Sequence, residues 1–146
     1  MDLMHMDEQN SFRNMVIATV CGYGTDEKKA TLHVQLPYMK KGEDILEDVE
    51  LLLPYGGKSY GFLCRAEIGD QVMVMFSGEH MRRAVAIGCI APGDASIWEG
   101  CSEKNEQKQW LMKNGMKLSL WDEENAAKAE ITCQDTAMQL DRKGTA

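Results

Sequence analysis

Three short strand-like segments near the carboxyl end constrain the fold of this chain more than any other feature. Apolar and polar residues alternate in each of them, as in a strand with one buried face. The apolar set is Met116, Leu118, Leu120, Ile131, Cys133, Met138 and Leu140, and the polar set is Lys117, Ser119, Glu130, Thr132, Gln139 and Asp141. Three strands of about five residues do not build a two-layer core alone. We therefore expect a partner to cover the apolar side, and the simplest partner is further copies of the same chain.

An energy estimate favours three copies of the chain over one. Burial of one apolar side chain contributes roughly 1.5–2.5 kcal/mol. Three chains around one axis would bury about twenty such side chains, a gross gain on the order of 30–50 kcal/mol before conformational entropy is subtracted. The alternative is a single meander that folds back onto its own chain, which would bury only part of this surface.

Composition excludes several classes of protein. A net charge of −7 over 146 residues argues against a binder of phosphate backbones, because such proteins concentrate Lys and Arg. No stretch approaches the roughly 18 apolar residues of a membrane span, and the acidic N-terminal sequence is unlike a cleaved signal peptide. We expect cytoplasmic synthesis without a signal peptide. Buried free thiols, not disulfides, are expected for the five scattered cysteines, Cys21, Cys64, Cys89, Cys101 and Cys133.

Closely spaced strand signals occupy the first two thirds of the chain, separated by Gly- and Pro-containing turns. The predicted strands cover residues 15–21, 30–36, 49–53, 71–76 and 84–90, with a shorter segment at 60–64. Five strands in about 75 residues are typical of an OB-type barrel, since an immunoglobulin-type sandwich needs about seven. The expected barrel core is Val16, Leu32, Val34, Val72, Val74, Phe76, Val85 and Ile87.

Four segments follow from this pattern: a polar arm at residues 1–12, the barrel at 13–91, a polar linker at 92–108, and the C-terminal strands at 109–146. The predicted strand at 71–76 is apolar on both sides, because Met73 and Met75 alternate with valines. A neighbour is therefore expected to cover the outer side of this strand.

No motif of the sequence indicates catalysis. The nucleophile elbow, the P-loop, the zinc-protease helix and the dinucleotide fingerprint are all absent from it. We predict that His33 and His80 are ordinary surface residues. The acidic cluster, made of Glu43, Glu47, Asp48 and Glu50, is predicted to be a solvated loop. We therefore expect no catalytic residue, no metal and no cofactor.

The alternative function is that of an OB-fold binding module. Such barrels bind single-stranded nucleic acid when exposed aromatic rings lie beside a basic groove. Tyr38, Tyr55 and Tyr60 would supply rings, but no basic stripe accompanies them. In this alternative the ligand is single-stranded nucleic acid or a protein, and the C-terminal strands form an oligomerisation hairpin.

Several short motifs occur in a characteristic order along residues 13–144. They are Gly56–Gly57 before Gly61, the segment Glu67-Ile-Gly-Asp-Gln-Val, Phe76 before a glycine turn, Ile87-Gly88, and the tail from Lys113 to Asp141. With these motifs the chain resembles the phage baseplate assembly protein V and VgrG spike proteins, in which an OB domain precedes a triple-stranded β-helix. Ala66 and Ala84 stand where prolines are common in that family.

The resemblance implies an all-β homotrimer: a five-stranded OB barrel followed by a short trimeric β-helix or β-prism whose axis the seven apolar residues line. It implies a membrane-puncturing spike of a phage tail, a tailocin, or an extracellular or type VI-like contractile system, which transmits force without catalysis. The barrel would seat on the tail-tube hub, and no nucleic acid is implied. A separate PAAR-like tip protein would contact Leu140, Lys143, Gly144 and Thr145. The assembled protein would reside in the tail or injection particle.

Overall fold

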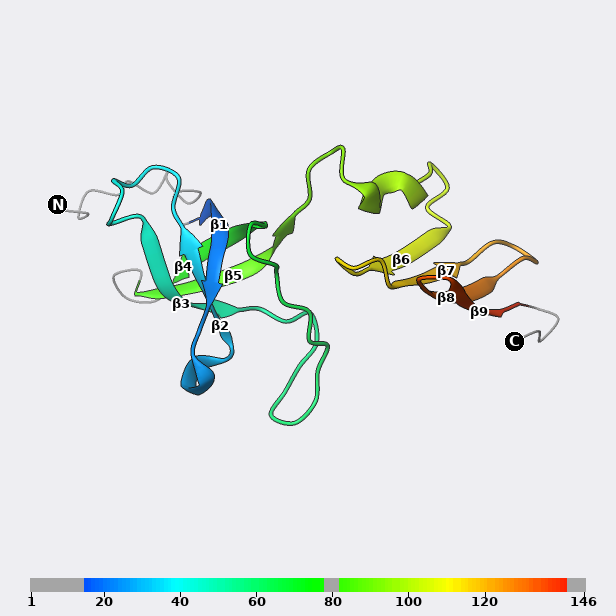
Figure 1. Ribbon diagram of the computed structural model, residues 1–146, viewed down its shortest axis with the longest axis horizontal. Coiled ribbons are helices and arrows are strands. Elements are labelled where there is room, and N and C mark those ends of the chain that lie inside the picture. Colours follow the sequence, from blue (N-terminus) through cyan, green and yellow to red (C-terminus); the bar gives the residue numbers. More distant parts are fainter. Residues whose placement is uncertain (1–14, 78–81, 142–146) are drawn as a thin grey trace. The chain divides into compact units, whose positions relative to one another are not determined.

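The computed structural model describes residues 15–77 and 82–141. The chain divides into two compact units, residues 1–91 and 92–146 (Figure 1). The described elements are all strands except two short 3-10 helices, η2 (Asp26–Lys28) and η4 (Ser96–Gly100). This confirms the all-β fold class.

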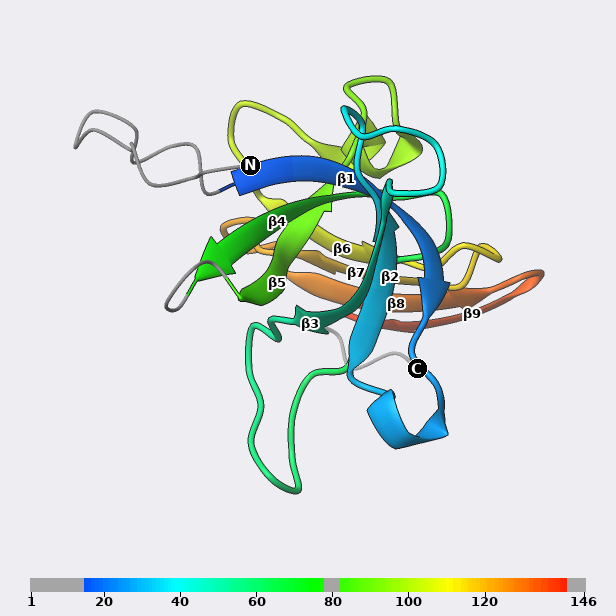
Figure 2. The same cartoon turned by 90° about the vertical axis from the view of Figure 1, so that its left-hand side faces the viewer.

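A closed five-stranded barrel forms the first unit. Its strands are β1 (Met15–Tyr23), β2 (Thr31–Gln35), β3 (Ile45–Leu51), β4 (Gln71–Ser77) and β5 (Arg83–Ile90). They close in the order β1-β2-β3-β5-β4 (Figure 2). All pairs are antiparallel except β3 and β5, which pair in parallel over two residues. This closed ring of five short strands confirms the predicted OB-like barrel. Closure also leaves no open strand edge that could pair elsewhere.

The barrel core consists of small and medium aliphatic side chains from alternate strand positions. Its buried members are Ala18, Val20, Leu32, Val34, Val49, Ala66, Val72, Val74 and Ala86. Four residues expected in the core, Leu32, Val34, Val72 and Val74, are at most 1 % exposed. Val16 and Phe76 are partly buried and pack against this cluster.

Strand β5 faces the core with the opposite set of residues from the expected one. Ala84 and Ala86 point inward, while Val85 and Ile87 are partly exposed and absent from the core cluster. The register explains the difference, because β4 pairs its inward Val74 with Ala86 across a bulge. Both faces of this strand are apolar, so alternation alone does not distinguish them.

The segment between β3 and β4 also differs from the expectation. Strand β3 begins at Ile45, four residues before the predicted start. Residues 60–64 form no strand; instead one isolated bridge joins Gly56 to Gly61. Residues 52–69 make a loop that projects from the barrel in both views (Figures 1 and 2). We call this segment the arm.

A four-stranded antiparallel sheet forms most of the second unit. It runs in the order β6 (Gln107–Leu111), β7 (Lys117–Trp121), β8 (Lys128–Cys133) and β9 (Thr136–Leu140). A tight turn at Gly115 joins β6 to β7, and the backbone there has φ of 87°. Every ladder pairs consecutive strands of the same chain. Short turns bring neighbouring strands together, so these three ladders join strands of one chain and leave the outer edges of β6 and β9 for other partners.

The segment expected to be a linker, residues 92–108, carries structure of its own. It contains η4 and the first residues of β6. Trp98 donates its indole N–H to the Pro92 carbonyl at 2.6 Å, within the second unit.

Candidate functional site

The most distinctive surface of the second unit is one face of its sheet. Cross-strand register places Trp110, Leu118, Ile131 and Met138 in a single row over all four strands. A second row joins Leu120 to Leu140 through Ala129. By strand alternation Met116 and Cys133 belong to the same side. The structure thus brings together all seven residues that were expected to line a trimer axis, and we call this surface the apolar face.

Much of the apolar face is accessible in the single chain. Leu120, Ile131, Met138 and Leu140 are 42–57 % exposed, and Cys133 is exposed as well. A surface of this kind on a soluble protein marks an interaction site. Every residue of β9 is exposed. The outer edge of β9 pairs with no further strand of the described chain.

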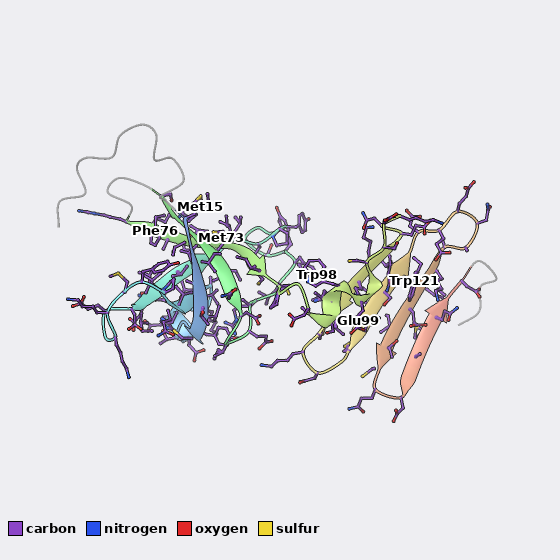
Figure 3. All side chains as sticks on the ribbon, turned by 90° about the horizontal axis from the view of Figure 1, so that it is seen from above. Met15, Met73, Phe76, Trp98, Glu99 and Trp121 are labelled. Atoms are coloured by element: carbon purple, nitrogen blue, oxygen red, sulfur yellow. The ribbon has the colours of Figure 1, made fainter. Side chains whose placement is uncertain are left out.

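The opposite face of the same sheet is mostly polar and partly covered, and it also carries Leu111 and Trp121. Lys117 pairs with Thr132, and Ser119 pairs with Glu130, so these side chains share one side. Helix η4, which carries Trp98 and Glu99, lies on this side (Figure 3). Gln109 donates its side-chain amide N–H to the Ile97 carbonyl of this helix at 2.6 Å. Ser119 is 1 % exposed, and its hydroxyl has no hydrogen-bond partner. The expected polar residues therefore share one side of the sheet, although Ser119 is buried; that this side faces outward in a trimer stays a prediction.

The barrel has an apolar outer wall. Ile17 pairs with Met73, and Met15 pairs with Met75, which in turn pairs with Val85. These residues alternate with the inward valines, so they point outward; Met15 and Met73 lie near one another in Figure 3. Met15 and Ile17 are exposed and the other three are partly exposed. We call these five residues the methionine wall.

A second apolar surface of the barrel unit lies on the arm. Its exposed apolar residues are Leu52, Tyr55, Tyr60, Phe62, Leu63 and Ile68, with exposed fractions of 40–77 %. The Tyr55 and Tyr60 rings contact each other at 5.4 Å between centroids. Two backbone bonds, from Gly57 to the Tyr60 carbonyl and from Phe62 to the Tyr55 carbonyl, close the tip.

The base of the arm is fixed to the barrel. The Arg65 guanidinium lies 3.9 Å from the centre of the Tyr23 ring, and the Tyr23 hydroxyl donates to the Ala66 carbonyl at 3.0 Å. Gly69, with φ of 99°, donates its N–H to the Val20 carbonyl at 2.8 Å. A hollow of about 980 Å³ lies beside this anchor, between the arm and the β1–β2 turn.

The predicted acidic cluster lies mostly on a strand rather than in a loop. Glu47, Asp48 and Glu50 belong to β3. Asp48 pairs with Lys28, and Glu50 forms a two-pronged ion pair with Arg83. The Arg83 hydrogen bond lowers the pKa of Glu50. The Asp48 and Glu50 carboxylates therefore form ion pairs across the barrel surface, which indicates a structural role.

The histidines were considered as possible metal ligands. His33 is partly buried against Gly22 and its Nδ1 has no hydrogen-bond partner, whereas His80 lies outside the described residues. Within residues 15–77 and 82–141, no group of three His, Cys, Asp or Glu side chains is placed to hold a metal ion. The segments described include no helix long and apolar enough to cross a membrane.

All five cysteines are free and exposed, so the expectation of buried thiols is wrong. Cys89 pairs with the inward Val72 and lines a hollow with Cys64, yet it stays exposed there. Cys133 lies on the apolar face. Apolar neighbours in sequence suggested burial, but both faces of β5 are apolar and the apolar face has no cover in one chain. Partial burial still raises the pKa of the Cys21 and Cys89 thiols, which lowers the fraction of reactive thiolate.

The structure does not describe every residue of the expected tip-protein contact. Leu140 ends β9 and is exposed. Lys143, Gly144 and Thr145 lie outside the described residues. Sequence reasoning also missed the arm, whose one signal was the cluster of tyrosines and leucines around Pro54, Gly56 and Gly57.

Comparison with known families gives one match. Residues 16–90, the barrel with its arm, match the type VI secretion system/phage-baseplate injector OB domain. No curated protein matches the chain. The matched segment is half of the sequence and coincides with the closed barrel, and the family is structural and non-catalytic, with a role in the tail spike or baseplate. The chain therefore belongs to the family of type VI secretion and phage-baseplate injector OB-domain proteins.

Proposed function

We propose that this protein is the homotrimeric spike at the tip of a contractile injection system. Its barrel seats on the hub of the tail tube, and its C-terminal sheets form a rigid shaft that punctures the target membrane. The work comes from sheath contraction, and the spike transmits force without chemistry. The observation that carries the proposal is the apolar face, whose row of four large side chains crosses an entire sheet.

Three copies of the sheet form the walls of a three-sided prism with their apolar faces inward. Each chain supplies one whole wall, because its strands pair within the chain. The two edge strands, β6 and β9, are different, so β9 of one chain lies beside β6 of the next, as a cyclic arrangement requires. The polar face, with Lys117 and Glu130, then lies outward and keeps the shaft soluble.

Partial burial in the single chain reduces the energy that trimer formation contributes. The large residues of the apolar face are about half exposed, so association buries about half of each side chain. The gross gain for three chains is on the order of 15–25 kcal/mol before the entropy of association. A trimer forms in two binding steps, so the entropic cost of association is about 8–30 kcal/mol. The gain from the apolar face exceeds the lower part of this range and is comparable with the rest.

The tip of the shaft is proposed to bind a separate PAAR-like protein. Leu140 and the nearby residues Lys143 to Thr145 would offer three copies of one short segment to a conical cap. Deletion of residues 143–145 should abolish capture of the tip protein while the trimer stays intact. Undiminished capture by the deleted trimer would exclude this contact.

Size in solution tests the proposed function. Three chains of 16.4 kDa give a particle of about 49 kDa, which light scattering coupled to gel filtration resolves from a monomer. We expect this mass at every concentration from micromolar upward. A monomer, whose sheet is then covered by its own barrel or left open, would contradict the spike and favour the OB-fold binding module.

A further inference from the structure

We propose that, in the trimer, the arm of each barrel packs against the methionine wall of the neighbouring barrel. This inference rests on the proposed trimer and names a second contact within it. Two exposed apolar surfaces on one barrel, one projecting and one flat, are the observation behind it.

Cyclic symmetry favours this pairing. Around a threefold axis, side-by-side subunits meet through two different patches, one from each neighbour. The arm supplies a projecting patch of aromatic and aliphatic side chains that is held at its base by Arg65 and Tyr23. The methionine wall supplies a flat patch whose thioether side chains adapt to the shape of a partner.

The size of the arm surface favours a tethered partner over a free one. At about 200 Å² for a whole aromatic side chain, Tyr55, Tyr60 and Phe62 present roughly 300 Å², and the exposed Leu52, Leu63 and Ile68 add a similar area. A stable complex between separate proteins buries about 800 Å² on each partner. Within a trimer, residues 91–106 join each barrel to the shared C-terminal sheets, and such tethering gives effective concentrations in the millimolar range. A small contact then suffices.

The arm differs in charge from the rest of the chain. Residues 52–69 carry Lys58 and Arg65 against Glu67, a net charge of +1, whereas the whole chain carries −7. The remainder is therefore at −8, so the arm of one copy is attracted to its neighbour while the two remainders repel each other. Ionic strength weakens both effects, and the apolar surfaces carry the contact.

Oxidation of native methionines by hydrogen peroxide, followed by peptide mass spectrometry, tests the contact in the full chain. Met73 and Met15 should oxidise about fivefold more slowly in the wild-type trimer than in Tyr60→Glu, which places a charge on the arm. Leu63→Glu is a second arm variant, in case the first unfolds. Tyr38→Glu is the matched control, because Tyr38 is an exposed tyrosine outside the arm. Exposed Met39 should oxidise at one rate in all variants.

The outcomes separate this inference from the proposed function. The monomeric variant Ile131→Asp supplies the reference rate of an isolated barrel, and Tyr60→Glu should reach that rate while remaining a trimer. A wild-type trimer whose wall methionines oxidise at the reference rate overturns the arm contact and leaves the spike standing. A wild-type monomer overturns both.

Discussion

Apolar residues alternate along the strands of both the barrel and the C-terminal sheet, yet only the barrel completes its core within one chain. Leu32, Val34 and Val74 are fully buried because the ring of five strands closes around them. Ile131 and Met138 sit in an equally regular register, but the four-stranded sheet stays open and leaves them about half exposed. Alternation therefore specifies which side of a strand is apolar, and closure decides whether the chain can bury it alone.

The largest effect is expected from a charge in the barrel core. Val74→Asp places a carboxylate where no water reaches, so the barrel should lose more than about 4 kcal/mol of stability and unfold. Circular dichroism and proteolysis measure this. Gln71→Asp, on the same strand at an exposed position, is the control. A folded Val74→Asp barrel would show that the core tolerates water.

A charge on the apolar face should act differently, by removing the trimer and leaving each chain folded. Ile131→Asp would bring three carboxylates onto a dry axis, which is more costly than the association gains. Sedimentation should show a monomer with an unchanged circular dichroism spectrum. Gln139→Asp, on the polar face of β9, should remain a trimer. If Ile131→Asp remains a heat-stable trimer, the apolar face does not line the axis.

The same substitution, glycine to alanine at a position with positive φ, can be made in each of the two units. Gly69→Ala in the barrel and Gly115→Ala in the β6–β7 turn should each cost about 1 kcal/mol, because an added Cβ disfavours that backbone region. Thermal unfolding followed by calorimetry should show each variant lowering only its own transition. Gly93→Ala, where the backbone φ is not positive and the space is open, is the control. A single shared shift would mean that the two units unfold together.

The smallest effect concerns acid sensitivity of the β2–β3 loop. Hydrogen bonds from the Gln35 amide and the Gly42 N–H hold the pKa of Asp44 below its ordinary value of 3.8. The stabilisation is complete above that ordinary value and is lost as the pH falls through the lower folded one. Asp44→Asn should therefore flatten the decline of melting temperature below about pH 4. Glu47→Gln on β3 should leave that decline unchanged, and an unchanged decline in Asp44→Asn would rule out this role.

Much of the fold could be read from the chain. Strand β4 and strand β5 lie within one residue of their predicted bounds, since short runs between glycine turns are strong signals. The start of β3 was missed because Ile45 and Leu46 stand among charges that resemble a loop. Residues 60–64 were misread as a strand, because an apolar projecting arm and a buried strand have similar composition.

The candidate surfaces were less accessible to sequence reasoning. The seven residues of the apolar face were predictable, since a period of two fixes the side of each residue. The methionine wall was visible only as a strand apolar on both sides, and the inward choice of Ala86 over Ile87 depended on a bulge in β4–β5 pairing. Local alternation contains no information about such register shifts.

The sequence by itself determined the all-β class, the two-part organisation and the apolar alternation of the last strands, because these depend on local periodicity and turn chemistry. Only the tertiary structure decided that the C-terminal ladders pair within one chain, that the five thiols are exposed, and that an anchored arm stands out from the barrel. Those features depend on which strands meet and in which register, and on whether a sheet closes on itself, which no single segment determines.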